Sequence, residues 1–214
     1  RVRYSNNLCM ITLFLQRLER EWPRLLWGGV LGVAFLASLS FALPKQFSST
    51  MRLLVVQANV AGLDPYTAVK STEQIAGSVR ELTYTSLVAN RVLSETDGLD
   101  TEYFPEDEYR RRRTWQKTVE VGLVPGTGIL TVTVFHPERD QARRLVEGVA
   151  RQIIEQTPNF GYNAQAKVID TPLPSRWFAR PDIVLNGLLG GMIGVFLALL
   201  SLFFKEIPVR RKGR

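Results

Sequence analysis

Residues 171–204 read TPLPSRWFARPDIVLNGLLGGMIGVFLALLSLFF, and this stretch decides the architecture because its prolines lead directly into a long apolar segment. Positions 183–204 lack charged residues, and so does an earlier segment, 25–43. A helix rises about 1.5 Å per residue and the hydrocarbon core of a bilayer is about 30 Å thick, so each segment is long enough to span a membrane. The sequence therefore predicts two transmembrane helices with a domain between them.

The first apolar segment has an alternative interpretation as a cleaved signal peptide. Ser40-Phe41-Ala42 matches a small-x-small cleavage site. The segment is longer than the apolar region of signal peptides, which is usually about 7–15 residues. We therefore expect an uncleaved anchor.

Basic residues are concentrated at the two ends of the chain. Residues 1–24 carry five arginines against two glutamates, and residues 205–214 carry five basic residues against one glutamate. These net charges of +3 and +4 account for the whole net charge of +7. Because basic residues beside membrane spans stay in the cytoplasm, we expect both termini inside the cell, the central domain outside, and the protein in the cytoplasmic (inner) membrane. The high pI of 9.9 then comes from the basic residues that orient the chain in the membrane. It does not indicate nucleic-acid binding, because no motif for such binding occurs in the sequence.

These criteria divide the chain into five parts. They are a cytoplasmic leader at 1–24, a span at 25–43, an extracytoplasmic domain at 44–182, a span at 183–204 and a basic cytoplasmic tail at 205–214. Residues 10–22 of the leader repeat apolar side chains at helical spacing, which predicts an amphipathic helix on the inner membrane surface; a frayed leader is the alternative. The single cysteine, Cys9, lies in the leader, so the outer domain has no disulfide.

The central domain alternates between strand and helix patterns. Val- and Thr-rich runs predict strands at 48–60, 118–124, 129–135 and 164–170, and apolar residues at helical spacing predict helices at 65–93 and 137–156. The order β-α-β-β-α-β predicts an α+β fold of the ferredoxin-like type, in which helices cover one face of an antiparallel sheet. The first and last strands then lie side by side, each next to a membrane span.

Arginines supply the candidate contact residues of the outer domain. Residues 97–113 form a polar segment that ends in Arg110, Arg111, Arg112 and Arg113, and we expect a solvated loop there. The alternative is contact with an anionic glycan, lipid headgroups or a neighbouring subunit, since arginine pairs bidentately with such anions. Arg143, Arg144 and Arg151 on the second predicted helix are further candidates for subunit or glycan contacts.

Glycines and prolines mark the spans and their connector. Gly28 and Gly32 are four residues apart in the first span, as are Gly187 with Gly191 and Gly190 with Gly194 in the second, a spacing that lets helices pack closely in lipid. Glycine is also simply common in membrane helices. Pro172, Pro174 and Pro181 predict a stiff connector between the last strand and the second span. The alternative is that these prolines only mark the boundary between the two elements.

Motifs for catalysis are missing from the sequence. The single histidine, His136, precedes a proline at a predicted helix start and lies on the opposite side of the membrane from Cys9. No HExxH, CxxC or GxxxxGK[ST] pattern occurs, and Gly126-x-Gly128 leads into a strand with no helix N-terminus to hold a phosphate. We therefore expect a protein that is not an enzyme, with no catalytic residue, metal or cofactor.

Several stretches carry a resemblance to a known family. They are Pro172-x-Pro174 with Arg180-Pro181-Asp182 before a second span that contains Gly194, the segment Phe135-His136-Pro137-Glu138-x-x-Gln141-Ala142, and the leader that ends in Trp22-Pro23. The pattern resembles the polysaccharide co-polymerases, the Wzz-type chain-length determinants. The outer domain lacks room for the long helical arm of the O-antigen members, so the chain is more similar to the short capsule and exopolysaccharide branch. His136 stands where the family usually has an acidic residue.

The resemblance implies a homo-oligomer that regulates chain length or export of a capsule, exopolysaccharide or lipopolysaccharide polymer. It also implies a polysaccharide polymerase, a flippase or a cytoplasmic tyrosine kinase as partners. The tail KEIPVRRKGR has no tyrosine and no nucleotide-binding motif, so a kinase would be a separate chain. Arg210, Arg211 and Lys212 are then candidates for contact with that kinase or with membrane lipid. A membrane-anchored sensor or ligand-binding module is the alternative function, and a transporter component would need several copies to form a conduit.

Overall fold

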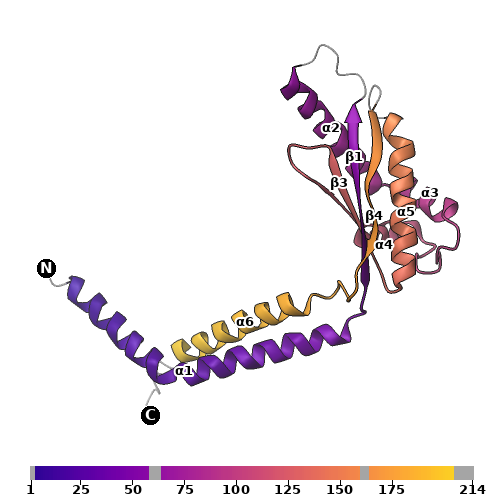
Figure 1. The fold of residues 1–214 in the computed structure, drawn as a ribbon. Coiled ribbons are helices and arrows are strands. Elements are labelled where there is room, and N and C mark those ends of the chain that lie inside the picture. Colours follow the sequence, from indigo (N-terminus) through magenta and orange to yellow (C-terminus); the bar gives the residue numbers. More distant parts are fainter. Residues whose placement is uncertain (1–2, 58–63, 160–163, 205–214) are drawn as a thin grey trace. The chain divides into compact units, whose positions relative to one another are not determined.

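The computed structural model describes residues 3–57, 64–159 and 164–204 (Figure 1). The chain forms two compact units. We call residues 1–44 together with 181–214 the helix unit, and residues 45–180 the sheet unit. Residues 58–60 of the first predicted strand and the basic tail residues Arg210, Arg211 and Lys212 lie outside the described residues.

The helix unit consists of two helices that pack against each other, α1 (Arg3–Ala42) and α6 (Ile183–Phe204). The leader residues 10–22 belong to α1, which is a single helix that includes Pro23. The segments Glu21–Ala42 and Ile183–Leu202 are long and apolar enough to cross a membrane by length and composition. Asp182 caps the start of α6, because its side-chain carboxylate accepts a hydrogen bond of 3.0 Å from the backbone N–H of Leu185.

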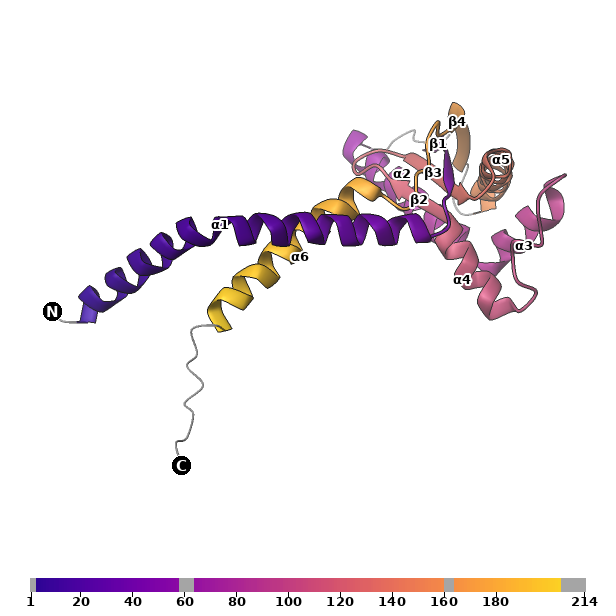
Figure 2. The same cartoon turned by 90° about the horizontal axis from the view of Figure 1, so that it is seen from below.

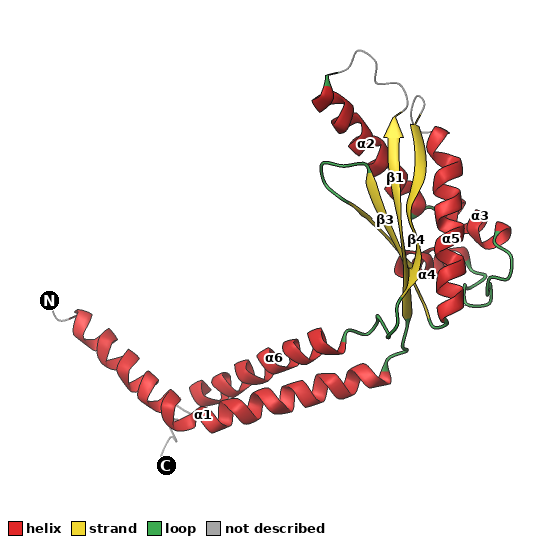
Figure 3. Cartoon of the chain, in the orientation of Figure 1, coloured by secondary structure: helices red, strands yellow, loops and turns green. Residues whose placement is uncertain are grey.

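The sheet unit combines helices with one four-stranded sheet (Figures 1 and 3). Its elements, in chain order, are β1 (Phe47–Gln57), α2 (Pro65–Thr83), α3 (Ser86–Glu95), α4 (Glu108–Thr118), β2 (Val119–Leu123), β3 (Ile129–His136), α5 (Arg139–Gln156), a short 3-10 helix (Thr157–Asn159) and β4 (Ala164–Pro174). The strands lie in the order β2-β3-β1-β4 and every neighbouring pair is antiparallel. This confirms the predicted α+β class and antiparallel sheet, and it places the first and last strands side by side.

One face of the sheet is covered by helices, and the residues of the strands alternate accordingly. Met51, Leu53 and Val55 of β1 are buried, whereas Arg52 between them is exposed. The core also contains Leu130, Val132 and Val134 of β3, which face Leu145, Val146 and Val149 of α5. We call the other side, which carries Arg52, Thr133 and Glu120, the open face. Strand pairs such as Thr50 and Thr133, whose hydroxyls lie 3.1 Å apart, line it.

The prediction of one helix over 65–93 is wrong, because the chain bends at Tyr84 and Thr85 between α2 and α3. Partners from distant parts of the chain stabilise this break. The indole N–H of the buried Trp115 donates a hydrogen bond of 2.8 Å to the carbonyl of Thr83, and the hydroxyl of Tyr84 accepts one of 2.7 Å from the N–H of Val121. The Thr83 carbonyl, which a continuous helix would pair internally, therefore finds its partner across the core.

The polar segment 97–113 is also less irregular than predicted, since α4 begins at Glu108 and contains the four consecutive arginines. The carboxylate of Asp107 accepts a hydrogen bond of 2.9 Å from the N–H of Arg110, which caps the helix. The buried Trp115 anchors α4 to the core. Figure 2 shows α3 and α4 side by side at one margin of the sheet unit, in agreement with their packing contacts.

Candidate functional site

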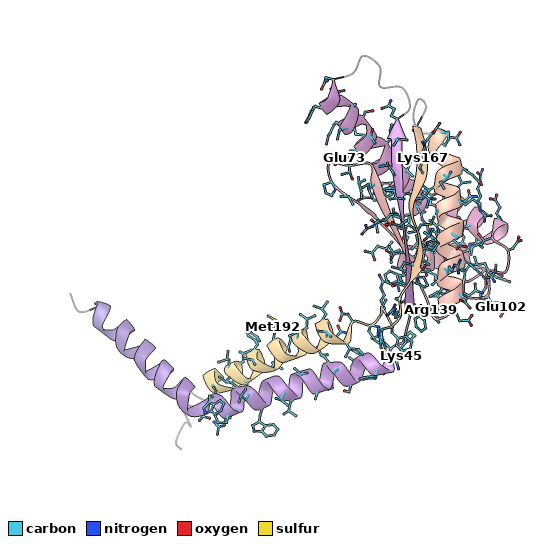
Figure 4. The ribbon with its side chains drawn as sticks, in the orientation of Figure 1. Lys45, Glu73, Glu102, Arg139, Lys167 and Met192 are labelled. Atoms are coloured by element: carbon cyan, nitrogen blue, oxygen red, sulfur yellow. The ribbon has the colours of Figure 1, made fainter. Side chains whose placement is uncertain are left out.

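The chain enters and leaves the sheet unit at the same end of the sheet, which we call the base. β1 begins there with Phe47, which pairs with His136 at the end of β3, and β4 ends there with Pro174, which pairs with Ser49. Lys45 lies at this end in Figure 4, whereas Lys167 and Glu73 lie at the other end. The base is therefore the part of the sheet unit that is covalently closest to both long helices.

Residues 175–180, which we call the strap, cross the base after β4 ends. The N–H of Ser175 donates to the carbonyl of Ser48 at 2.7 Å, and the hydroxyl of Ser175 accepts from the N–H of Ser48 at 3.0 Å. Farther along, the N–H of Gln46 donates to the carbonyl of Arg180 at 2.9 Å, and the N–H of Ala179 donates to the carbonyl of Gln46 at 2.8 Å. These bonds hold the outgoing chain against the incoming chain.

Arg180 ends the strap and reaches across the open face. Its guanidinium lies 3.5 Å from the centre of the Phe135 ring. One of its nitrogens donates to the carbonyl of Lys117 at 2.9 Å, and the other lies 3.2 Å from the Glu120 carboxylate. The Lys117 carbonyl is in the last turn of α4, where the helix dipole favours a cation. Arg180 thus joins the strap to β3, α4 and β2 at once.

Rings fill the remainder of the base. The rings of Phe47 and Phe178 have centroids 4.7 Å apart, and the ammonium of Lys45 lies 5.1 Å from the centre of the Phe178 ring. On the covered side, the rings of Tyr103 and His136 meet edge to face at 4.5 Å. The amide of Gln46 donates to the hydroxyl of Tyr103 at 3.3 Å, which connects this pair to the incoming chain.

His136 is a buried structural residue of the base. Its Nδ1 atom accepts a hydrogen bond of 3.1 Å from the N–H of Glu138. Burial lowers the pKa of its imidazole, while the charges of Asp100 and Glu138 act in the opposite direction. The ring is therefore neutral at pH 7 and closes the turn between β3 and α5. In the described parts of the chain, no cluster of His, Cys, Asp and Glu side chains has the arrangement of a metal site.

The three connector prolines lie in two different parts of the structure. Pro172 and Pro174 belong to β4, which extends four residues beyond the predicted end at Asp170. β4 is an edge strand, where a residue without an N–H is tolerated and blocks pairing with a further strand. Pro181 follows the strap and belongs to the helix unit. Strand pairing and the hydrogen bonds of the strap therefore hold the base together, and the stiffness of the proline connector stays a prediction.

The glycines predicted to pack helices lie between α1 and α6 of the same chain. A Cβ on Gly28 would lie 2.8 Å from Cβ of Ala198 and 2.9 Å from the Gly194 carbonyl oxygen. A Cβ on Gly32 would collide with the carbonyl of Gly190 and lie 3.0 Å from Cα of Gly194. Gly28, Gly32, Gly190 and Gly194 therefore form a backbone-to-backbone contact that excludes any side chain. Gly187 and Gly191 instead face Val33, with closest approaches of 3.7 Å and 3.1 Å.

A polar contact adds to this helix pair. The amide of Asn186 donates a hydrogen bond of 2.9 Å to the hydroxyl of Ser40, which in turn donates to the Leu36 carbonyl at 2.9 Å. Ser40 is only 2% exposed. Polar groups that are shielded between apolar helices need such partners, so this bond fixes how the end of α1 and the start of α6 align.

The candidate arginines occupy different surroundings. Arg110, Arg112 and Arg113 are exposed on α4, and their side chains form no ion pair or hydrogen bond with any residue in the described ranges. Arg111 is half-buried and approaches the Glu106 carbonyl at 3.5 Å. On α5, Arg143 pairs with Glu147 at 3.1 Å and Arg144 donates to the Asp97 carbonyl at 3.3 Å, whereas Arg151 is exposed. The candidate arginines therefore fall into two groups: some contact other groups of the fold, and the others are exposed and available to a partner.

Sequence reasoning missed Arg180 and the exposed Trp177 as members of the base. Their only signal in the sequence was position, within a few residues of the long apolar segment that begins at Ile183. Comparison of the sequence with protein-family models and with curated proteins gives no match.

Proposed function

We propose that this chain is a membrane polysaccharide co-polymerase, which regulates chain length or export of a capsule, exopolysaccharide or lipopolysaccharide polymer by assembling into an oligomer. The observation that carries the proposal is the base of the sheet unit. There the strap and Arg180 bind the outgoing chain to the incoming chain, so the two segments that lead to the membrane-length helices leave the domain from one hydrogen-bonded end of the sheet. Such a domain suits regulation by the geometry of packed copies.

The membrane assignment rests on composition and exposure. The most apolar windows of α1 and α6 are only 6% and 17% buried, which is unlike the core helices of a water-soluble protein. Tight glycine packing between the two helices is the form of association favoured in lipid. Basic residues at both termini favour a cytoplasmic location of the ends and an extracytoplasmic location of the sheet unit, in the inner membrane.

The strand order β2-β3-β1-β4 with two main helices on one face supports the ferredoxin-like topology for this outer domain. We propose that the domain is not catalytic, that its copies meet side by side, and that a polymerase, a flippase or a separate tyrosine kinase acts beside it. The exposed arginines of α4 are the proposed cations for a neighbouring subunit or an anionic glycan.

Native mass spectrometry in lipid nanodiscs tests the assembly. We expect an oligomer, and a monomer would favour a membrane-anchored sensor instead.

Deletion of the reading frame tests the pathway, because we expect a changed length distribution or yield of a surface polysaccharide. Labelling of Cys9 only after the membrane is permeabilised is the expected topology result.

A further inference from the structure

We propose that Lys45, Arg176, Trp177 and Phe178 form a lipid-headgroup site, called the base patch, that binds phosphates of the extracytoplasmic membrane leaflet. This inference rests on the membrane location proposed above. The site would hold the base of the sheet unit against the membrane surface, in addition to the covalent link through the two spans.

Exposure of large aromatic rings is the first observation. Trp177 is 82% exposed and Phe178 is 49% exposed, whereas Trp115, another tryptophan of the sheet unit, is completely buried. A tryptophan this open to water gives up favourable burial of its large apolar ring. Tryptophan is enriched at membrane interfaces because its amphipathic indole fits the headgroup region.

Cations placed beside these rings are the second observation. The Lys45 ammonium lies 5.1 Å from the centre of the Phe178 ring, and that ring packs on Phe47 at 4.7 Å. Arg176 is exposed next to Trp177 in the strap and forms no ion pair with any of the described residues. Lysine and arginine bind phosphate oxygens through charge-assisted hydrogen bonds. The backbone hydrogen bonds at Ser175 and Ala179 hold the strap that carries Arg176, Trp177 and Phe178 against the incoming chain.

The short covalent connections bring the membrane surface within reach of the base patch. Lys45 follows the last residue of α1, Ala42, by three positions, and Trp177 precedes the first residue of α6, Ile183, by six. A chain extends at most about 3.6 Å per residue, so these residues lie within roughly 11 Å and 22 Å of the ends of the two helices. The headgroup region adds about 5–7 Å to each side of the hydrocarbon core. Aromatic rings and cations at such short reach match the chemistry of zwitterionic and anionic headgroups.

A collision-accessibility experiment with spin labels tests the base patch in the full chain. In a Cys9→Ser background, single cysteines replace Trp177, Lys167 and Met192, and each carries a nitroxide in lipid nanodiscs. Lys167 is the control because it is exposed at the opposite end of the sheet unit, and Met192 reports on α6, where it is 70% exposed (Figure 4). Accessibility to oxygen, which concentrates in lipid, is compared with accessibility to a water-soluble nickel complex.

We expect the label at 177 to be intermediate, with more oxygen and less nickel contact than the label at 167, and the label at 192 to contact oxygen only. If 177 matches 167 while 192 reports lipid, the base patch is refuted and the membrane proposal stands. If 192 contacts nickel freely, the membrane proposal fails as well. Dipolar broadening between labels at 177 without increased oxygen contact would assign the patch to a second copy and overturn the lipid site.

The phosphate part of the proposal has its own variant. Arg176→Gln should reduce the oxygen contact of the label at 177, and the reduction should be larger in nanodiscs that contain phosphatidylglycerol than in phosphatidylcholine alone. Arg151→Gln is the matched control, because this arginine is exposed on α5 and lies outside the base. Equal effects of the two variants would show that the patch does not recognise phosphate.

Discussion

Arg180 places its guanidinium 3.5 Å from the centre of the Phe135 ring and thereby covers an aromatic side chain on the otherwise open face of the sheet. Phe135 is only 8% exposed, although it lies outside the helix-covered core. The same guanidinium contacts the Lys117 carbonyl and the Glu120 carboxylate. One side chain therefore fastens the end of the domain to three of its other elements.

Removal of this side chain should weaken the sheet unit. We expect Arg180→Ala to lower the free energy of unfolding by about 1–3 kcal/mol, since it removes a cation–π contact and hydrogen bonds of a charged group. Arg180→Lys should recover only part of the loss, because an ammonium cannot make the same planar contacts. Urea unfolding of the full chain in detergent, followed by tryptophan fluorescence, measures both. A loss for the exposed control Arg151→Ala as large as for Arg180→Ala would contradict the prediction.

The glycine contact between α1 and α6 predicts a difference between two alanine substitutions in this helix pair. Gly32→Ala should separate α1 from α6 and cost about 1–3 kcal/mol, because its Cβ would collide with the Gly190 backbone. Gly187→Ala should be nearly neutral, since its nearest neighbour would be a methyl group of Val33 at 3.7 Å. Thermal unfolding in detergent and interhelical spin-label distances report the two effects. Equal behaviour of the two variants would mean that the helices pack differently.

His136 predicts a dependence of stability on pH. Burial lowers its pKa below the value of about 6.5 in the unfolded chain, so the unfolded state binds more protons than the folded state between the two values. Stability should be unaffected by this residue above pH 7 and should fall as the pH drops below about 6.5, by at most about 1.4 kcal/mol per pH unit.

The variant His136→Asn, which keeps a hydrogen-bond acceptor for the Glu138 N–H, should remove this slope. Asp64 and Glu73, whose pKa values are lowered chiefly by hydrogen bonds with Thr67 and Lys70, titrate only below about pH 4.5. Urea titrations between pH 5.5 and 8 therefore isolate the histidine. Persistence of the full slope in the asparagine variant would assign it to another group.

The exposed arginines of α4 should matter for assembly and leave folding unchanged. We expect the triple substitution of Arg110, Arg112 and Arg113 by glutamine to change the free energy of unfolding by less than about 0.5 kcal/mol, because the three side chains are exposed. It should shift the mass distribution in nanodiscs toward smaller species. The control Arg143→Gln breaks only an ion pair within α5 and should leave that distribution unchanged.

The sequence was sufficient to predict elements with strong local patterns. The two long apolar helices were predicted from the length of their uncharged segments, and the four strands and α5 from apolar residues that recur with a period of about 2 or 3.6 residues. The break at Tyr84 was missed because apolar residues continue through it at helical spacing, and the partners that stabilise it, Trp115 and Val121, lie more than 30 residues away. α4 was missed because few of its residues are apolar, although Asp107 supplied a capping signal.

The role of Arg180 could not be predicted for a similar reason. Its partners Lys117 and Glu120 precede it by 63 and 60 residues, and nothing in the local sequence connects them. The glycine spacing did indicate close helix packing, but spacing alone does not say whether the neighbour belongs to the same chain. Only the three-dimensional arrangement shows Gly28 and Gly32 against Gly190 and Gly194.

Polysaccharide length in a deletion strain, complemented with wild-type, Arg91→Ala or Arg180→Ala chains, tests the central claim most directly; Arg91, exposed on α3, is the control. We expect deletion to alter the modal length or the yield of the polymer on a gel. Wild type and Arg91→Ala should restore the original distribution, and Arg180→Ala, expressed at an equal level, should restore it only in part. A deletion strain whose polymer is unchanged in both length and yield would contradict the account.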